Sequence, residues 1–496
     1  MKKILPFLLL ATTAFLLFKN LGNIYLWEDE AETAVIANNL WTTGYPTPFD
    51  GKNLVTQMNG EDIAVRGNHY LWRLHPWLQY YLLAPFLHFK KNTFFARLPF
   101  VLLGLAAIYL IYLTAKKLFS ERIALFALFI SLFCWPLLVY IRQARYYSLL
   151  LFFSILLIYL YLHFLEKRKR AWLWFSIAAI FLFHSHFVAF FGTITGLWIH
   201  FLLFYWRKIK EYLKELVWIF SSIAIFTLPW FWLVAYFALF SHSSHLSAFG
   251  DHLQFYSSVF LSIFPICLLC LGFLLCFYNC LKYRQEILLL VFVGLTTTLT
   301  VSFFIPVPYT RYLIGLFPIL IILTAAFLDW ILKKNLFWGS LALFLIFLHF
   351  FTPWPWLLEN KGKGFKNNWG FFSYLSEITH DYDGPVEAIV NFLNQSTKKN
   401  PTVLTNYAWE PIIFYTNAKV LNRITDPSSP LFPLTKGENP DFIIPRHCWK
   451  PMQIPANYRK IVLSAKDICW ENRSEPLLHH FRTVTTGPNV VIYQRE

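Results

Sequence analysis

Residues 94–141 read FFARLPFVLLGLAAIYLIYLTA (94–115), KKLFSER (116–122) and IALFALFISLFCWPLLVYI (123–141). Each of the two apolar runs is long enough to cross a bilayer as a helix, which takes about 20 residues. The charged segment between them is too short to be anything but a turn. These 48 residues therefore predict a pair of membrane-spanning helices joined on one side of a membrane.

The composition extends this prediction to the whole chain. Of the 496 residues, 57% are hydrophobic, 20% are aromatic and only 14% are charged, which is typical of a polytopic membrane protein. The formal net charge is +16, but the basic residues form small clusters between apolar runs rather than one stripe. That distribution argues against a nucleic-acid partner.

Apolar runs of the right length predict about 11 transmembrane helices. They lie near residues 4–21, 94–115, 123–141, 147–165, 171–188, 189–206, 216–239, 257–280, 287–305, 312–332 and 336–352. The fifth and sixth helices must be separated near Phe187–Ala189 by almost no loop.

The basic clusters predict the orientation. Lys2, Lys3 and segments 116–122, 166–170, 207–214, 281–286 and 333–335 fall on one side, which the positive-inside rule makes cytoplasmic. The first helix lacks a small-residue cleavage site and is expected to stay uncleaved. We therefore expect a multi-pass protein of the inner or plasma membrane, with a cytoplasmic N-terminus and with residues 22–93 and the C-terminal tail outside.

The tail has the pattern of a small α/β domain. A helix-like segment at 384–399 precedes the strand-like runs PTVLTNY, PDFIIPR, KIVLSA and NVVIYQRE. The predicted domains are a transmembrane domain at 1–352, which includes the outer loop 22–93, a linker at 353–383 and an outer soluble domain at 384–496. Cys448 and Cys469 lie in the outer domain, where a disulfide can form in an oxidising compartment, but the sequence does not establish one.

Four carboxylates stand together in YLWEDEAETAVIANNLW, residues 25–41. Asp29 as N-cap and Glu32 at the third helical position would form a capping box for a helix through ETAVIANNL. That structural role accounts for two of the acids. It leaves Glu28 and Glu30 without a purpose at the membrane face, which makes the cluster a candidate functional site.

Several segments together resemble the GT-C superfamily of integral membrane glycosyltransferases, in the branch of protein O-mannosyltransferases and aminoarabinose transferases. They are WEDEAETAVIANNLWTTGYP, LWRLHPWLQYYLLAPF, ARLPFVLLGLAAIYLIYLTAKKLF, IRQARYYSLLLFF and YTRYLIGLFPILIIL. No single motif is highly specific. Their order over the first two-thirds of the chain and their membrane placement carry the resemblance.

The resemblance implies a glycosyltransferase that takes its sugar from a polyprenyl-phosphate donor and inverts the anomeric centre. Its Asp-Glu pair falls on Asp29 and Glu30, with Asp29 as the catalytic base. One carboxylate suffices, since the phosphate leaves without a general acid and only the acceptor must be deprotonated. The acceptor, whether lipid, glycan or protein, is unknown from the sequence.

The leaving phosphate needs cations and hydrogen-bond donors at the outer ends of the spans. Arg311 and Tyr312 in YTRYL, and Arg142 and Arg145 in IRQARYY, lie at such ends. His75 stands where relatives often have a Lys-Pro-Pro. The predicted donor-binding residues are Arg311, Tyr312, Arg145, Arg142, His75 and Tyr81, and the predicted support or acceptor residues are Glu32 and His186. Interfacial anchoring or helix packing accounts for any one of them equally well.

No cofactor is expected. His242, His245, Asp251 and His252 in SHSSHLSAFGDH have zinc-ligand side chains, but a solvated polar loop also explains them, and a metal-independent transferase is favoured over a divalent-metal enzyme. Two alternatives stay open. A polyprenyl-lipid flippase would also have many spans and interfacial arginines, and a membrane scaffold would account for the outer domain but not for the acids.

Overall fold

The computed structural model describes residues 4–58, 60–232, 245–264, 283–351, 370–381, 384–421, 431, 439–447, 451–468 and 487–496. It is mainly helical and divides into two compact units. One unit, called here the helical unit, comprises residues 1–19, 100–142 and 146–375; the other, called here the acid unit, comprises 20–99, 143–145 and 376–496. The predicted division at residues 352 and 383 stays a prediction.

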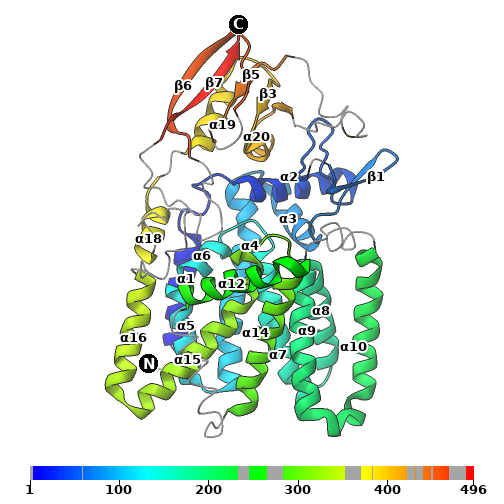
Figure 1. The fold of residues 1–496 in the computed structure, drawn as a ribbon, viewed down its shortest axis with the longest axis vertical. Helices are drawn as coiled ribbons and strands as arrows, with labels where there is room; N and C mark the ends of the chain where they lie inside the picture. Colours follow the sequence, from blue (N-terminus) through cyan, green and yellow to red (C-terminus); the bar gives the residue numbers. More distant parts are fainter. Residues whose placement is uncertain are drawn as a thin grey trace. The chain divides into compact units, whose positions relative to one another are not determined.

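The helical unit is built from long apolar helices, several of which stand side by side (Figure 1). In chain order, the helices and turns of this unit are α1 (Leu5–Phe18), α4 (Thr93–Leu118, which begins in the acid unit), α5 (Glu121–Phe133), α6 (Trp135–Ile141), α7 (Tyr147–Leu165), α8 (Ala171–Ser185), α9 (Phe187–Tyr205), the 3-10 turn η1 (Trp206–Lys208), α10 (Ile209–Trp230), α12 (His245–Ile263), α14 (Arg284–Phe304), the 3-10 turn η4 (Thr310–Leu316), α15 (Phe317–Lys334), α16 (Leu336–Phe351) and α18 (Phe371–Thr379, which ends in the acid unit).

Five helical segments of the described chain are long and apolar enough to cross a membrane, or six if the bent pair α5–α6 counts as one. Three shorter apolar helices, α1, α8 and α16, accompany them. A mainly helical protein with several spans is therefore confirmed, whereas the number 11 stays a prediction. The predicted span at 257–280 lies largely outside the described residues.

Two breaks in the helices follow from local sequence. The predicted span 123–141 bends by 71° between α5 and α6, since Pro136 has no N–H to continue the helix of α5. The predicted boundary near Phe187 is confirmed, because only His186 separates α8 from α9. The His186 Nδ1 atom accepts the Ala189 N–H at 3.2 Å and so caps α9.

Small residues let two of these helices approach closely. A Cβ atom on Gly192 of α9 would lie 2.5 Å from the Thr297 Cα of α14, and one on Gly196 would lie 2.5 Å from the Val293 Cα. The Thr296 hydroxyl donates to the Gly192 carbonyl at 2.7 Å. Close backbone contact of this kind is common between membrane helices.

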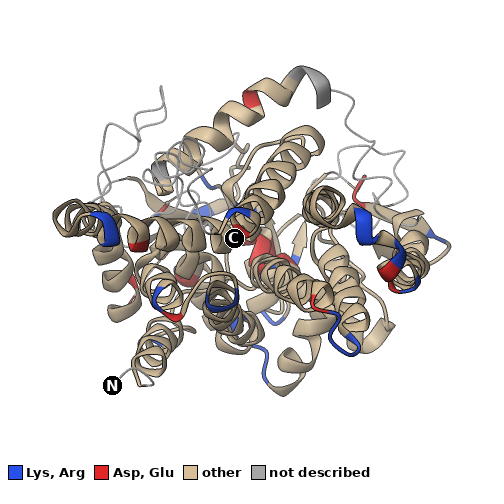
Figure 2. Ribbon diagram, turned by 90° about the horizontal axis from the view of Figure 1, so that it is seen from below, with Lys and Arg blue, Asp and Glu red and all other residues tan. Residues whose placement is uncertain are grey.

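Most of the helical ribbon is free of charged residues, many of which lie at helix ends and in connecting turns (Figure 2). α4 ends with Lys116 and Lys117, and α15 ends with Lys333 and Lys334. The Lys117 Nζ atom, in the last turn of α4, lies 2.5 Å from Oε1 of Glu166, which directly follows α7. This is the pattern from which the cytoplasmic side is predicted.

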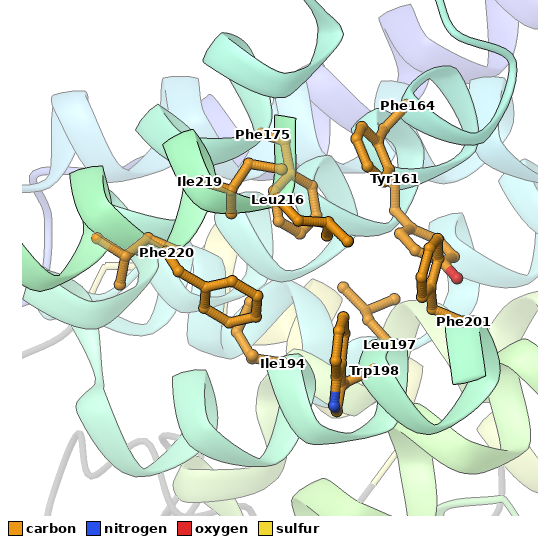
Figure 3. Close-up of a pocket in the computed structure, with 11 residues that line it drawn as sticks. Tyr161, Phe164, Phe175, Ile194, Leu197, Trp198, Phe201, Leu216, Ile219 and Phe220 are labelled. Atoms are coloured by element: carbon orange, nitrogen blue, oxygen red, sulfur yellow. The ribbon is translucent and has the colours of Figure 1, made fainter. Parts of the chain in front are cut away.

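A small apolar cavity of about 40 Å³ lies among α7, α8, α9 and α10 (Figure 3). Phe175, Leu197, Trp198 and Phe220 are among the side chains around it, and no predicted site residue lines it. It has room for little more than a few water molecules.

The acid unit combines the first predicted outer loop with the C-terminal α/β fold. Its helices are α2 (Glu28–Thr43), α3 (Leu78–Phe89), α19 (Pro385–Gln395) and α20 (Trp409–Tyr415); its strands are β1 (Ile63–Arg66), β2 (His69–Trp72), β3 (Thr402–Thr405), β4 (Lys419–Leu421), β5 (Phe442–Ile444), β6 (Tyr458–Lys466) and β7 (Asn489–Arg495). β1 and β2 form an antiparallel hairpin with Ile63 opposite Trp72.

The C-terminal sheet has the strand order β4-β3-β5-β7-β6. β3 is parallel to β4 and β5, and β7 is antiparallel to β5 and β6. The predicted helix and all four predicted strands of the tail are confirmed as α19, β3, β5, β6 and β7. The three-residue strand β4 was not predicted from the sequence.

Candidate active site

The acidic stretch forms the first turn of α2, within the acid unit (Figure 1). The N-cap is Trp27, and Glu30 at the third helical position accepts the Trp27 N–H at 3.4 Å. The predicted helix is confirmed, but its predicted cap at Asp29 is wrong by two residues. Asp29 instead lies inside the first turn, where the positive end of the helix dipole stabilises a carboxylate.

Glu30 is fully buried and held from several directions. The Arg97 guanidinium donates to both carboxylate oxygens, from Nε at 2.9 Å and from Nη2 at 2.7 Å. The Ala144 N–H donates to Glu30 at 2.7 Å. Arg97 in turn donates to the carbonyls of Leu21 and Ile24 at 3.0 and 2.9 Å. This cluster joins the entry to α2, the start of α4 and the 143–145 segment.

Arg145 contacts both Asp29 and Glu32. Its side chain is 1% exposed, and Nη1 donates to Glu32 Oε1 at 2.9 Å, to the Asp29 carbonyl at 2.9 Å and to the Thr33 hydroxyl at 3.0 Å. Nη2 lies 3.4 Å from Asp29 Oδ2. The Glu32 side chain is fully buried, whereas that of Asp29 keeps 12% of its surface exposed. Asp29 is thus the more accessible of the two carboxylates paired with Arg145.

Two side chains from the segment after α2 complete the surroundings. Gln57 donates to Glu32 and, at 3.4 Å, to Asp29 Oδ1. His75 Nε2 lies 3.1 Å from Arg145 Nη2 and 4.0 Å from Glu32 Oε1. The predicted residues Asp29, Glu30, Glu32, Arg145 and His75 are therefore close together in the acid unit.

Burial and the neighbouring charges alter the pKa values of titratable groups in this site. Burial raises the pKa of Glu32, the charge of Arg145 opposes the rise, and the charge of Asp29 adds to it. Burial also raises the pKa of Tyr80, and Glu32 raises it further. The carboxylates of this site therefore cannot all be ionised at neutral pH without a large cost.

Hydrogen bonds and a ring stack within the acid unit join the tail to this site. The Tyr415 hydroxyl accepts the Leu26 N–H at 2.9 Å and lies 2.7 Å from the Thr93 hydroxyl. The Glu387 carboxylate accepts the Tyr25 N–H at 2.7 Å, and the Tyr25 and Tyr415 rings stack at 4.2 Å. α20 consequently lies against α2, and the tail contributes to the surroundings of the acids.

The other predicted residues are engaged elsewhere. Arg142 lies in the helical unit and donates to the Leu16, Leu17 and Lys19 carbonyls at 3.2, 2.7 and 2.9 Å, so it caps the end of α1. Tyr81 is 47% exposed on α3, in the acid unit, and donates to the Gly44 carbonyl at 3.3 Å.

Arg311, Tyr312 and His186 lie in the helical unit. The Arg311 guanidinium stands 4.4 Å from the Tyr309 ring centre and 5.5 Å from that of Tyr312. The rings of Tyr312 and His186 are 5.7 Å apart. The structure thus groups these three predicted residues with Tyr309.

Across the described ranges, no three His, Cys, Asp or Glu side chains are arranged to hold a metal ion. His252 contacts the Ser302 carbonyl at 3.0 Å. His242 lies outside the described residues, as do Cys448 and Cys469.

Sequence reasoning gave no role to Arg97, Gln57 or Glu410. Arg97 stands in ARLPF, where a basic residue at the start of a span suggests interfacial anchoring. Gln57 carries no motif. Glu410 is the one acid between Thr402 and Asp426, and a lone acid in an apolar helix was the signal that could have pointed to it.

The class of protein that this fold defines is an integral membrane protein with a GT-C-type fold. Residues 74–232 match the sequence model of the dolichyl-phosphate-mannose-protein mannosyltransferase family. The structure resembles ArnT from Cupriavidus metallidurans bound to undecaprenyl phosphate, with a TM-score of 0.58, 14% identity, 89% of this chain covered and 93% of that one. The apo state of that protein matches with the same values.

A weaker likeness, with a TM-score of 0.45, is to the Archaeoglobus fulgidus oligosaccharyltransferase, at 13% identity over 88% of this chain and 68% of that one. No curated protein matches the sequence. The predicted resemblance to GT-C glycosyltransferases is confirmed by the family match and by the fold.

Proposed function

We propose that the protein is a glycosyltransferase that moves a sugar from a polyprenyl-phosphate donor to an acceptor at the outer face of the membrane. Asp29 acts as the base, and direct attack on the anomeric carbon inverts it. The family match over residues 74–232 and the ArnT-like fold support the reaction class. The chemical nature of the donor is supported by the undecaprenyl phosphate bound to that ArnT.

The observation that carries the proposal is that the acids of α2 differ in their partners and in their exposure. Glu30 is occupied by Arg97, Ala144 N–H and Trp27 N–H, and Glu32 is fully buried against Arg145. Asp29 alone of these three combines partial exposure with a cation at 3.4 Å. Arg145 and the N-terminus of α2 favour the ionised carboxylate, which is the form that accepts a proton from the acceptor.

Glu30 then acts by positioning α2, because its oxygens are taken by backbone and guanidinium donors. Glu32 and Arg145 hold the next turn, with His75 at the edge of the group. Arg142 holds the end of α1. In this proposal the donor phosphate is bound chiefly by Arg311, with Tyr312 and His186 beside it in the helical unit, and Tyr81 contacts the donor lipid from an exposed face of α3.

The membrane topology of the proposal has a cytoplasmic N-terminus, about 11 spans and an outer C-terminal α/β fold in the inner or plasma membrane. The clustering of Lys and Arg at the turns supports it. A reporter fused after Glu496, or inserted after residue 60, should be active only outside the cytoplasm. Cytoplasmic activity at either place would contradict the assignment of Asp29 as an outer-face base.

The reaction is tested with purified protein in nanodiscs, a polyprenyl-phosphate sugar and membrane extract as acceptor source. Asp29→Asn keeps the shape but removes the basicity, so release of free polyprenyl phosphate should fall by about 100-fold or more while donor binding survives. Arg311→Ala should weaken donor binding as well, since it removes a charge that pairs with phosphate. Glu61→Gln, an exposed acid of the same loop, serves as the control and should behave like wild type.

Near-wild-type release by folded Asp29→Asn would exclude this residue as the base. Wild-type protein that moves the donor between leaflets without any release would instead favour a flippase. A protein with neither property would favour a scaffold.

A further inference from the structure

Glu410 is a carboxylate from the tail that is buried beside the acids of α2. It lies in YAWEPIIFY (407–415), at the start of α20, and is 4% exposed. α20 packs against α2 within the acid unit. Among the described residues, the Glu410 Oε2 atom has no hydrogen-bond partner. A buried oxygen in this position is costly unless something is bound to it.

The charges around Glu410 are predominantly negative. Burial raises its pKa well above the ordinary value, and the charges of Glu28, Glu32 and Asp29 raise it further. These three residues, all on α2, are called here the carboxylate cluster. A backbone hydrogen bond opposes the rise, and the charged groups with the largest influence on the pKa of Glu410 are these three acids.

In the part of the chain that the structure describes, the charged groups on the elements packed against α20 have other surroundings. On α2, Glu30 is paired with Arg97. On α19, Glu387 is an acid that accepts the Tyr25 N–H. Lys91 stands 5.1 Å from the Phe414 ring, and Lys419 of the edge strand β4 is half-buried.

Two states could relieve this accumulation of charge, namely a bound cation or a proton. The described residues offer no metal-holding group of three ligands here. A proton on Glu410 removes one charge from the cluster and turns the unpartnered oxygen into an O–H donor. Such a donor beside carboxylates forms a strong, charge-assisted hydrogen bond.

We propose that Glu410 is a positioning residue of the acid site, held as an uncharged carboxylic acid whose O–H donates to the carboxylate cluster and keeps Asp29 ionised and oriented as the base. The role of Asp29 in this statement rests on the proposed function. The uncharged state of Glu410 does not. The tail would thereby contribute a donor to the site that is assembled on α2.

The protonation state is tested without turnover, by infrared difference spectroscopy on the full chain in nanodiscs at neutral pH. Subtracting Glu410→Gln from wild type should reveal one carbonyl stretch of a protonated carboxylic acid, which shifts in D₂O. Glu61→Gln, which removes an exposed acid, should reveal none. Absence of the band in the Glu410 difference would overturn the proposal, and so would Mg²⁺ or Mn²⁺ stabilising wild type but not Glu410→Gln.

The positioning role is tested by two substitutions of similar size. Glu410→Gln keeps an uncharged donor and should retain kcat within about threefold, whereas Glu410→Met has no donor and should lose about tenfold or more, with little change in KM for the donor lipid. The acidic limb of the rate profile should move to higher pH in Glu410→Met, because Asp29 loses a donor to its ionised form. The limb should not move in Glu410→Gln.

A merely structural role would lower the amount of folded protein without moving this limb. Glu410→Met with wild-type kcat and an unmoved limb, or Glu410→Gln as impaired as Glu410→Met, would overturn the positioning role. Wild-type protein that releases no polyprenyl phosphate would refute the proposed function instead, and the infrared band would still decide the state of Glu410.

Discussion

The ion pair between Glu30 and Arg97 should be the strongest single interaction that holds α2 in place. Both side chains are almost fully inaccessible, with side-chain exposures of 0% and 6%. Two charge-assisted hydrogen bonds of 2.9 and 2.7 Å join them. Removing one partner leaves the other charged and buried, which typically costs about 3–5 kcal/mol.

A double-mutant cycle measures the pair directly. Glu30→Met should destabilise the acid unit by about 3–5 kcal/mol, with up to a further 1–3 kcal/mol because the Ala144 N–H loses its acceptor. Arg97→Met should cost about 3–5 kcal/mol as well. The double variant removes both charges, so its cost should fall short of the sum by about 2–3 kcal/mol.

The assay is hydrogen exchange of the α2 amides in nanodiscs, read by mass spectrometry as a local free energy of opening. The exchange should accelerate strongly in each single variant. Lys117 and Glu166 provide a matched control, since they also form a pair at 2.5 Å but with side-chain exposures of 18% and 44%. Breaking that pair should cost no more than about 1 kcal/mol. Additive costs at Glu30 and Arg97, or single costs below 1 kcal/mol, would refute the reasoning.

Three further outcomes are expected. Gly192→Ala should destabilise the helical unit by about 1–3 kcal/mol through overpacking. Gly294→Ala is the control and should leave the stability unchanged, because its Cβ atom would meet nothing closer than 4.0 Å. Equal unfolding temperatures for the two variants would contradict this prediction. Tyr415→Phe loses the hydroxyl that accepts the Leu26 N–H and should speed limited proteolysis of the tail, with unchanged cleavage arguing against the anchor. Because the pKa of Glu410 is raised on folding from its ordinary 4.5, the folded protein holds a proton that the unfolded chain releases. Stability should therefore fall as pH rises above about 4.5, by up to about 1.4 kcal/mol per pH unit, and Glu410→Gln should reduce this slope in thermal unfolding measured against pH.

Features with a local cause were predictable from the sequence. The apolar runs, the break beside His186 and the strands of the tail each follow from a pattern within one segment. The cap of α2 was misplaced because Asp29 and Glu32 match the capping-box pattern, whereas the observed N-cap, Trp27, is not a residue type that the pattern favours. Only the contacts of Glu30 with the Trp27 N–H and with Arg97 identify the true helix start. The 71° bend at Pro136 was missed because a span was inferred from hydropathy, which takes no account of the proline.

The site itself depends on contacts between distant segments. Arg145 and Glu32 are 113 residues apart, and Arg97 and Glu30 are 67 apart. The hydrophobic periodicity of a sequence contains no information on which distant residues pair with one another. The resemblance to GT-C transferases made Asp29 the predicted base, and the place of Arg145 at the end of a predicted span assigned this arginine to the donor phosphate. The structure gives Arg145 carboxylate partners, and it alone brings Glu410 to the acids.

These pairings answer why a membrane protein gathers four acids in five positions. A single base on an isolated turn would need some other means to fix its direction and exclude bulk water. Here Glu30 fixes the helix start through Arg97, and Glu32 fixes the second turn through Arg145. Asp29, directly before Glu30 in the first turn, lies on this fixed backbone beside a cation at 3.4 Å and keeps 12% of its side-chain surface exposed. In the proposed function, Glu30 and Glu32 support Asp29 as the base. Replacing them should therefore alter the geometry and pH dependence of the reaction before it abolishes the chemistry.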